Sequence, residues 1–398
     1  MSVFGIVSEF NPFHKGHEYL ISAAKEMGAE AVVSVMSSSS TQRGELAAFD
    51  KYLRAEAAVS GGADLVLELP FPWCSASAEY FSSAAIKILA PICDTVIFGS
   101  ESGDIELLRS CADAAFDESF KEEYSCLLSK GAQSASAYTS LIQKNTGAEL
   151  LSNDILGVEY IKAAKRLGVE LDFVTVKRKG SGYLCSEPSK QSFDSALAIR
   201  NLIMSQGNKN GNKEELRKRL PKKSFELIEK AMETGEYTNF EKYLDSALFF
   251  YRMTSPDMID EMAECRGGIA QRICAAAQDS VSGKQFFESL KTKRYTDAKL
   301  RRALLFGMTG VRDEDLLFLP EYTLLLAADA KGRELISSCR KDENAMPVIT
   351  KMTDLAKLVS KNSKRQKEMS DSLSSVFTFC LNSRLASGSE LKKKPFIT

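Results

Sequence analysis

Histidine is scarce in this chain of 398 residues, which has only two. The nine cysteines do not compensate, because no two of them are spaced as Cys-x-x-Cys. Structural zinc sites need four cysteine or histidine ligands, usually in closely spaced pairs. We therefore expect no metal site built from the side chains of the protein.

Long apolar runs are also absent. No stretch approaches the length of a membrane span, and the segment from Met1 to Phe4 passes into a strand-like run without the basic and apolar regions of a signal peptide. Cysteines without a disulfide pattern or a signal sequence are typical of reduced thiols in a cytoplasm. The sequence predicts a cytoplasmic protein with no membrane partner.

An excess of one charge is missing too. The chain has 52 basic and 53 acidic residues, which gives a formal net charge of −1. Global charge therefore provides no argument for a nucleic-acid partner, and any basic surface must be local. We expect no DNA partner.

Short apolar runs alternate with helical stretches in the first half of the chain. Continuous apolar strands are typical of a parallel sheet that is covered on both faces. We expect strands at 3–8, 31–36, 65–69, 95–98 and 171–176, and helices near 18–27, 51–60, 79–89, 105–116, 122–130 and 156–167. The pattern predicts an α/β fold with a Rossmann-like parallel sheet.

The character of the sequence changes after about residue 205. Residues 206–212 are polar and rich in glycine and asparagine, which is typical of a loop or linker. From residue 213 onward the pattern is mostly helical, with short strands or extended connectors at 317–320 and 347–350 and a frayed tail at 391–395. We expect an α/β domain over 1–205 and a mostly α-helical domain over 213–398.

Both histidines lie in one segment, Glu9-Phe-Asn-Pro-Phe-His-Lys-Gly-His17, between the first expected strand and the first expected helix. Open parallel sheets bind ligands beyond the carboxyl ends of their strands, and a helix N-terminus favours phosphate. Two imidazoles there can stabilise the charge that develops as a phosphate ester bond breaks. The alternatives are a metal pair, which lacks further ligands, and two surface histidines at a helix cap. We assign phosphate chemistry to His14 and His17.

The segment Asn11-Pro-Phe-His-Lys-Gly-His17 resembles the HxGH signature of the nucleotidyltransferase superfamily. Further segments make the chain similar to a narrower family, the bacterial tRNA(Met) cytidine acetate ligases. They occur in family order as Val35-Met-Ser37 with Gln42-Arg-Gly44, Ala63 to Pro70, Phe98-Gly-Ser-Glu101, Asn153-Asp-Ile-Leu-Gly157 and Thr292-Lys-Arg-Tyr-Thr296. The resemblance covers most of the chain. It implies a nucleotidyltransferase-type, ATP-binding α/β domain followed by a helical, tRNA-binding domain.

That family converts ATP and acetate into acetyl-adenylate and pyrophosphate, and then transfers the acetyl group to N4 of the wobble cytidine of elongator tRNA(Met). The resemblance therefore implies ATP as a substrate, Mg²⁺ with it, and acetate and elongator tRNA(Met) as partners. It makes His14 and His17 the catalytic residues. The implied ATP-binding residues are Val7, Ser8, Glu9, Phe10, Asn11, Pro12, Phe13, His14, Lys15, Gly16, His17, Glu18, Tyr19, Leu20, Gly99, Asn153 and Arg178.

Several of these residue types admit a plainer role. Gly16 suits a close approach of the backbone to a nucleotide or a simple turn, and Lys15 suits a triphosphate or an exposed position. Arg178 can clamp phosphate through paired hydrogen bonds, or end a solvated strand. Asn153 can cap a helix that begins near Ile155, and can contact adenosine at the same time.

Two segments depart from the family pattern. Ser38-Ser-Ser-Ser-Thr41 stands where a Gly-His-like pair is expected, and Ser195-Ala-Leu-Ala-Ile-Arg200 has apolar residues at two hydroxyl positions. The second departure weakens the expectation of phosphate contacts from that loop. Residues 42–44 can contact ATP, acetate or RNA, and the sequence does not choose among them.

Local basic clusters carry the expectation of RNA binding. Lysine and arginine are concentrated at 213–223, 291–302 and 351–367, and each run also fits a solvated helix face. The second run interleaves arginines with Tyr295, which permits phosphate pairing and base stacking. We expect tRNA contacts from Lys293, Arg294, Lys299 and Arg302.

Two other functions compete with the ligase. One is a small-molecule adenylyltransferase that releases pyrophosphate, which the helical half and the altered 195–200 loop disfavour. The other is a non-catalytic RNA-binding protein with a vestigial ATP fold. The intact His14-Lys-Gly-His17 segment disfavours it, because binding alone would not need both imidazoles.

Overall fold

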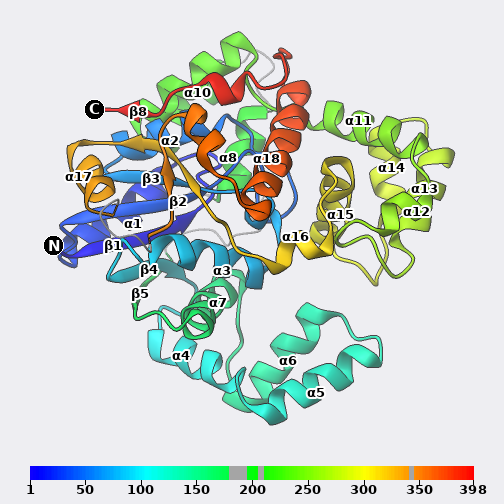
Figure 1. Ribbon diagram of the computed structural model, residues 1–398, viewed down its shortest axis with the longest axis horizontal. Helices are drawn as coiled ribbons and strands as arrows, with labels where there is room; N and C mark the ends of the chain where they lie inside the picture. Colours follow the sequence, from blue (N-terminus) through cyan, green and yellow to red (C-terminus); the bar gives the residue numbers. More distant parts are fainter. Residues whose placement is uncertain (179–194, 205–209, 340–344) are drawn as a thin grey trace.

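A mostly parallel β-sheet forms the centre of the molecule (Figure 1). The computed structural model describes residues 1–178, 195–204, 210–339 and 345–398. The strand order is β5-β4-β1-β2-β3-β6-β7, with β8 beside β6. The strands are β1 (Val3–Ser8), β2 (Ala31–Ser37), β3 (Leu65–Leu69), β4 (Thr95–Ser100), β5 (Asp172–Lys177), β6 (Thr323–Ala328), β7 (Val348–Ile349) and β8 (Phe396–Ile397).

The first five strands are confirmed within two residues at each end, and they pair in parallel. The chain proceeds from β1 through β2 to β3 on one side, and then returns to β4 and β5 on the other side of β1. The strand order therefore reverses between β1 and β4. Such a switch point leaves a crevice at the carboxyl ends of the two strands.

Helices surround the sheet and extend beyond it (Figure 1). No helix of the described residues combines the length and apolarity needed to cross a membrane. The helices are α1 (Lys15–Glu26), α2 (Lys51–Ser60), α3 (Ala78–Leu89), α4 (Ile105–Ala114), α5 (Glu118–Ser129), α6 (Ser134–Thr146), α7 (Ser152–Leu167), α8 (Ala196–Met204), α9 (Asn210–Arg219), α10 (Lys222–Thr234), α11 (Phe240–Arg252), α12 (Pro256–Asp260), α13 (Ile269–Asp279), α14 (Gly283–Leu290), α15 (Asp297–Thr309), α16 (Asp313–Leu317), α17 (Ala330–Cys339) and α18 (Lys361–Cys380). The 3-10 helices are η1 (Trp73–Ser75), η2 (Met352–Lys357) and η3 (Glu390–Lys392).

Both faces of the sheet are buried, which explains the continuous apolar strands. On one face Ile6 packs in a cluster with Ile21 of α1 and Ala58 of α2. On the other face Val33 belongs to a cluster with Phe81 of α3, and α7 packs beside α3. Parallel strands covered on both sides read as apolar runs, as predicted.

The expected helices are present, but three of them begin three or four residues earlier than the sequence suggested. Helix α1 begins at Lys15 because the side chain of His14 caps it, and α5 and α7 begin at Glu118 and Ser152. Helix α6 was not predicted. Helix ends depend on capping contacts that hydrophobic periodicity does not register.

The C-terminal half returns to the sheet. Strand β6 pairs with β3 in the antiparallel direction, and β7 and β8 pair with β6 in parallel. The expected extended segment at 347–350 contains β7, whereas 317–320 has no strand. Strand β6 was missed. The sheet is thus built from both halves of the chain, and the division at 205 and 213 stays a prediction.

The expectation of a frayed tail was wrong. Glu390 is 2% exposed, and its carboxylate accepts a hydrogen bond from the Ser39 hydroxyl in the loop after β2. The Lys393 ammonium lies 3.4 Å from a carboxylate oxygen of Asp50 and 3.5 Å from one of Glu236. The tail is ordered because its polar groups complete a buried cluster and its last strand joins the sheet.

The variant Glu390→Ala tests this anchoring of the tail. It removes the acceptor of the Ser39 hydroxyl and one of the carboxylates that face the buried Lys51 ammonium. We expect the free energy of unfolding to fall by about 2 kcal/mol, as when a buried hydrogen bond to a charged group is lost. Urea unfolding measures the change, with Lys394→Ala at a position outside this cluster as the matched control. Equal midpoints for the two variants would contradict the prediction.

Candidate active site

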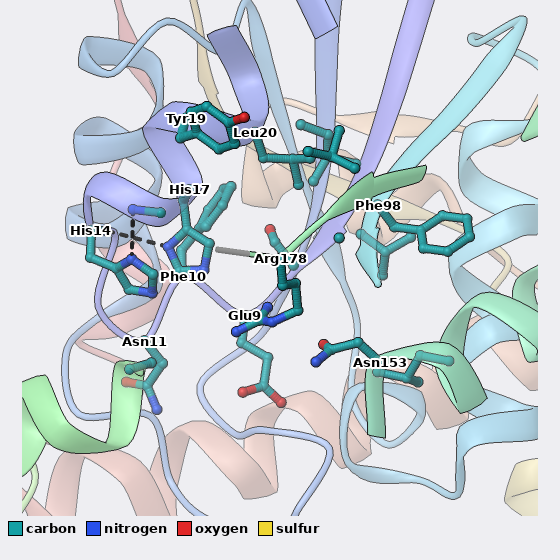
Figure 2. A pocket seen from close by; sticks show the side chains of 18 of the residues that line it. Glu9, Phe10, Asn11, His14, His17, Tyr19, Leu20, Phe98, Asn153 and Arg178 are labelled. Carbon is teal, nitrogen blue, oxygen red and sulfur yellow. Dashed lines mark hydrogen bonds between the residues drawn. The ribbon is translucent and has the colours of Figure 1, made fainter. Parts of the chain in front are cut away.

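A pocket lies at the carboxyl ends of β1, β4 and β5, at the switch point of the sheet (Figure 2). Its apolar and glycine lining comprises Ile6, Val7, Phe10, Gly16, Leu20, Phe81, Phe98, Gly99, Leu156, Val176 and Ala196. Its polar lining comprises Ser8, Glu9, Asn11, His14, His17, Tyr19, Gln42, Asn153, Tyr160, Lys177 and Arg178. An apolar cavity with a few convergent polar groups is the usual form of a small-molecule site.

Most of the residues predicted to bind ATP line this pocket. The exceptions are Pro12, Phe13, Lys15 and Glu18. Phe13 is fully buried, and a Cβ atom added at Gly61 would lie 2.3 Å from its ring. Phe13 therefore packs against Gly61, at the end of α2, and does not line the pocket. The aromatic and aliphatic wall was not predicted as a group, although Phe98 and Val176 stand at the ends of expected strands.

The turn after β1 is fixed by a buried arginine of α2. The Arg54 guanidinium is fully buried and donates to the backbone carbonyls of Glu9 (2.6 Å), Phe49 (3.0 Å) and Ser38. Phe10 adopts φ = +43°, a left-handed conformation that is unusual for a residue with a large side chain. The contacts of Arg54 hold the chain where this turn is required.

The two histidines fix one another at the start of α1. Nδ1 of His14 accepts the Gly16 N–H at 3.0 Å, and Nδ1 of His17 accepts the His14 N–H at 3.3 Å. The ring centroids are 3.8 Å apart. A nitrogen that accepts a hydrogen bond carries no proton, so the neutral rings hold their protons on Nε2. Both imidazoles can therefore donate from Nε2.

The environment keeps His17 neutral. Burial lowers its pKa well below the ordinary value, and the neighbouring His14 and Arg178 lower it further. Phe10 and Phe13 pack against the ring, with centroid distances of 4.9 and 5.8 Å. The ring is thus a rigid neutral donor near neutral pH.

Asn153 does not cap its helix, so that expectation was wrong. It lies in the first turn of α7, where Leu151 has the N-cap position. The Glu101 carboxylate instead accepts the backbone N–H groups of Asn153 (3.0 Å) and Asp154 (3.1 Å), and also the Asn153 amide. Glu101 thereby orients the side chain of Asn153. The position of Glu101 directly after the fourth strand was a signal in the sequence that it lies at the site.

Arg178 lies across the end of β4. A Cβ atom added at Gly99 would be 3.2 Å from Cγ of Arg178, so the glycine makes room for the arginine. Nε of Arg178 is 3.9 Å from Oε1 of Glu101. In Figure 2 its side chain lies between His17 and Asn153. The structure thus brings together the ends of β1, β4 and β5, as the strand order requires.

The loop that carries residues 42–45 joins the pocket to the C-terminal half. The Gln42 N–H donates to Oε1 of Glu9 at 3.0 Å. Gly44 sits against the backbone of α15. A Cβ atom added at Gly44 would lie 2.5 Å from the backbone nitrogen of Arg302. The Glu45 carboxylate lies 2.7 Å from Arg301 and 3.7 Å from Arg200.

Residues 195–200, the second segment that departs from the family pattern, also have a structural role here. The Ser195 hydroxyl accepts the Ala198 N–H at 3.1 Å, at the start of α8. Nη1 of Arg200 donates to the Asn11 carbonyl at 2.8 Å. These contacts hold α8 against the His loop, and Ala196 reaches the pocket wall.

The four basic residues expected to contact tRNA differ in accessibility. Lys293 and Arg294 carry no carboxylate partner among the ion pairs of the described residues, whereas Arg302 is paired with Glu264 at 2.9 Å and Lys299 with the same carboxylate at 3.4 Å. Tyr295 is half-buried; its hydroxyl donates to the Gly267 carbonyl, and cations of Arg294 and Lys299 lie 5.3 and 5.7 Å from its ring centroid. Lys293 and Arg294 are the members most open to a phosphate backbone.

Comparisons with known proteins agree with this geometry. Residues 1–387 match the family described as HIGH Nucleotidyl Transferase. The chain is 33% identical to a tRNA(Met) cytidine acetate ligase of Acetivibrio thermocellus, over 96% of this chain and 95% of the relative. It is 34% identical to the protein of that name in Thermotoga maritima, over 89% and 88% of the two chains.

Solved structures give the same result. The crystal structure of Thermotoga maritima TmcAL bound with alpha-thio ATP superimposes with a TM-score of 0.91 at 30% identity, covering 100% of this chain and 99% of that one. Its apo form gives a TM-score of 0.92 at 31% identity, with the same coverage. The chain therefore belongs to the HIGH nucleotidyl transferase family and, within it, to the tRNA(Met) cytidine acetate ligases.

Proposed function

We propose that this protein activates acetate with ATP and transfers the acetyl group to N4 of the wobble cytidine of elongator tRNA(Met). The observation that carries the proposal is the pair of neutral imidazoles at the N-terminus of α1, inside the switch-point pocket. The names of the relatives supply acetate, cytidine and tRNA(Met), and the Thermotoga protein was crystallised with an ATP analogue bound.

The phosphate end of ATP would lie at the histidine pair. Nε2–H groups of His14 and His17 and the free N–H groups of the first turn of α1 can donate to phosphate oxygens. Acetate attacks the α-phosphorus, pyrophosphate leaves, and fixed donors stabilise the charge that builds on the oxygens. Arg178 adds a permanent positive charge between the two ends of the pocket.

The nucleoside end would lie between the apolar wall and Asn153. Phe98, Leu156 and Tyr160 provide flat and aliphatic surface for a base. The Asn153 amide, held by Glu101, offers a fixed hydrogen-bonding group to the nucleoside. Burial in this pocket also shields an acyl-adenylate from water.

Magnesium would enter with the triphosphate. Among the described residues, no group of three or more His, Cys, Asp or Glu side chains is placed to hold a metal ion. Mg²⁺ keeps several waters and uses one or two carboxylates with substrate phosphates, so such a cage is not required. Bound Mg²⁺ supplies charge neutralisation of the phosphates.

The free cysteines agree with a reducing compartment. Among the described residues, the free thiols include Cys74, Cys93, Cys111, Cys126, Cys265, Cys274 and Cys380. Together with a tRNA substrate, this supports action in the cytoplasm.

The direct test is to supply ATP, labelled acetate and tRNA, digest the RNA, and analyse its nucleosides by mass spectrometry. We expect N4-acetylcytidine only when ATP and acetate are both present. Exchange of pyrophosphate into ATP should depend on acetate and fall with longer acids, because a pocket shaped for one methyl group disfavours larger ones. Formation of N4-acetylcytidine from acetyl-CoA without ATP would overturn the proposal.

Removal of either imidazole tests the phosphate assignment. We expect His14→Ala and His17→Ala each to lower acetate-dependent ATP–pyrophosphate exchange by about 100- to 1,000-fold, the usual effect of losing one transition-state donor. Lys25→Ala, at an exposed position on the same helix, is the matched control. Circular dichroism checks that the fold is kept. Exchange at the wild-type rate in a folded histidine variant would refute the assignment.

Charge reversal of Lys293 and Arg294 tests the expected RNA-binding surface. We expect the double variant Lys293→Glu/Arg294→Glu to weaken tRNA binding at least about tenfold and to flatten its salt dependence, since two phosphate contacts are lost. ATP–pyrophosphate exchange without tRNA should be kept. Lys361→Glu, an exposed charge reversal in another basic run, is the control. If Lys361→Glu weakens tRNA binding as much, tRNA binding is not specific to the 291–302 run and the prediction is wrong.

A further inference from the structure

Acetyl transfer to a cytidine amine releases a proton that the histidine pair is not set up to take. Nitrogen N4 carries two hydrogens, and one must leave when the amide forms. Nδ1 of His14 and of His17 already accepts a backbone N–H, and the protonated Nε2 atoms act as donors. Low basicity of His17 adds to this, because its pKa is well below the ordinary value. Another group must accept the proton.

Glu9 is the carboxylate among the described residues that line the pocket. Its backbone carbonyl is held by Arg54 at 2.6 Å, and its Oε1 accepts the Gln42 N–H at 3.0 Å. The first contact fixes the backbone of Glu9 and the second holds its side chain, and the hydrogen bonds of the described residues leave Oε2 open. A carboxylate with one oxygen anchored and the other open is preorganised to take a proton.

The place of Glu9 fits the reacting centre. In Figure 2 the histidine pair lies on one side of the pocket and Asn153 on the other, with Glu9 between them and its carboxylate turned away from the strand ends. A nucleotide that spans these two ends has its α-phosphate and acyl group in the middle. An amine that approaches the acyl carbon from outside the strand ends therefore meets the Glu9 carboxylate.

The charges around Glu9 also favour a base. Burial raises the pKa of Glu9, while the Gln42 N–H and the Arg200 and Arg43 guanidinium groups oppose the rise and Glu45 adds to it. Arg54 faces it from α2. The net direction is upward, which brings the carboxylate closer to the basicity that general-base catalysis needs near neutral pH.

We propose that Glu9 is the general base of acetyl transfer, an inference that rests on the proposed function. The N4 lone pair forms a C–N bond to the acetyl carbon, and the bond from that carbon to the phosphate oxygen breaks. AMP leaves with the electron pair. The N4 proton passes to Oε2 of Glu9 and then to solvent, so no oxidant or further reactant is needed.

The test separates the two half-reactions in the variant Glu9→Gln. This change keeps the size of the side chain and an acceptor for the Gln42 N–H, but removes the basic oxygen. Acetate-dependent ATP–pyrophosphate exchange reports adenylate formation, and transfer from chemically prepared acetyl-adenylate to tRNA reports the second step. We expect the ratio of transfer rate to exchange rate to fall about 100-fold, the lower range for loss of a general base.

The pH profile gives a second readout. In the wild type, transfer should rise with pH as Glu9 loses its proton, and this rise should disappear in Glu9→Gln. Glu9→Asp, which keeps the charge but withdraws it by one methylene, should retain the rise at a reduced rate. Glu26→Gln is the matched control, because that exposed carboxylate at the end of α1 does not line the pocket. It should leave the ratio unchanged.

The outcomes separate this inference from the function on which it rests. An unchanged ratio of transfer rate to exchange rate in Glu9→Gln overturns the inference. This holds if neither rate falls, and also if both rates fall together, as expected for a ligand of ATP or Mg²⁺. A wild-type protein without acetate-dependent exchange overturns the proposed function instead. Thermal unfolding of each variant confirms that the rates refer to folded protein.

Discussion

One buried guanidinium, that of Arg54, holds together the loops that form the pocket. It donates to a carbonyl in the turn after β1 and to carbonyls at both ends of the loop between β2 and α2, so two connections are fixed by one planar group. Burial lowers the pKa of Arg54, and the carboxylates of Asp50, Glu390 and Glu9 oppose that change. A charged group can be this deeply buried because its donors are satisfied and opposite charges face it.

The catalytic geometry follows from that arrangement. With the Glu9 carbonyl held, the chain can turn at Phe10, and His14 can cap α1 with its ring against that of His17. Backbone N–H groups thus help to orient both histidine rings. These backbone contacts set which ring nitrogen of each imidazole is protonated.

The sequence predicted what depends on local pattern. Apolar runs located β1 to β5, and the spacing of the histidines located the pocket, because both signals lie within a few residues. Strand β6 was missed because Thr323–Ala328 is rich in leucine and alanine, which favour helices, and pairing with β3 overrides that preference. The tail and the role of Glu101 were missed because their contacts join residues far apart in the chain.

The buried tail has a consequence for how the enzyme is made. Ser39, in the loop after β2, bonds to Glu390, which is 351 positions further along the chain. A ribosome delivers the N-terminal residues first, so the loop after β2 stays without this partner until Glu390 has been added and has emerged. The loop that supplies Gln42 to the pocket can therefore gain this contact only late in synthesis, and a copy that is terminated before Glu390 lacks it.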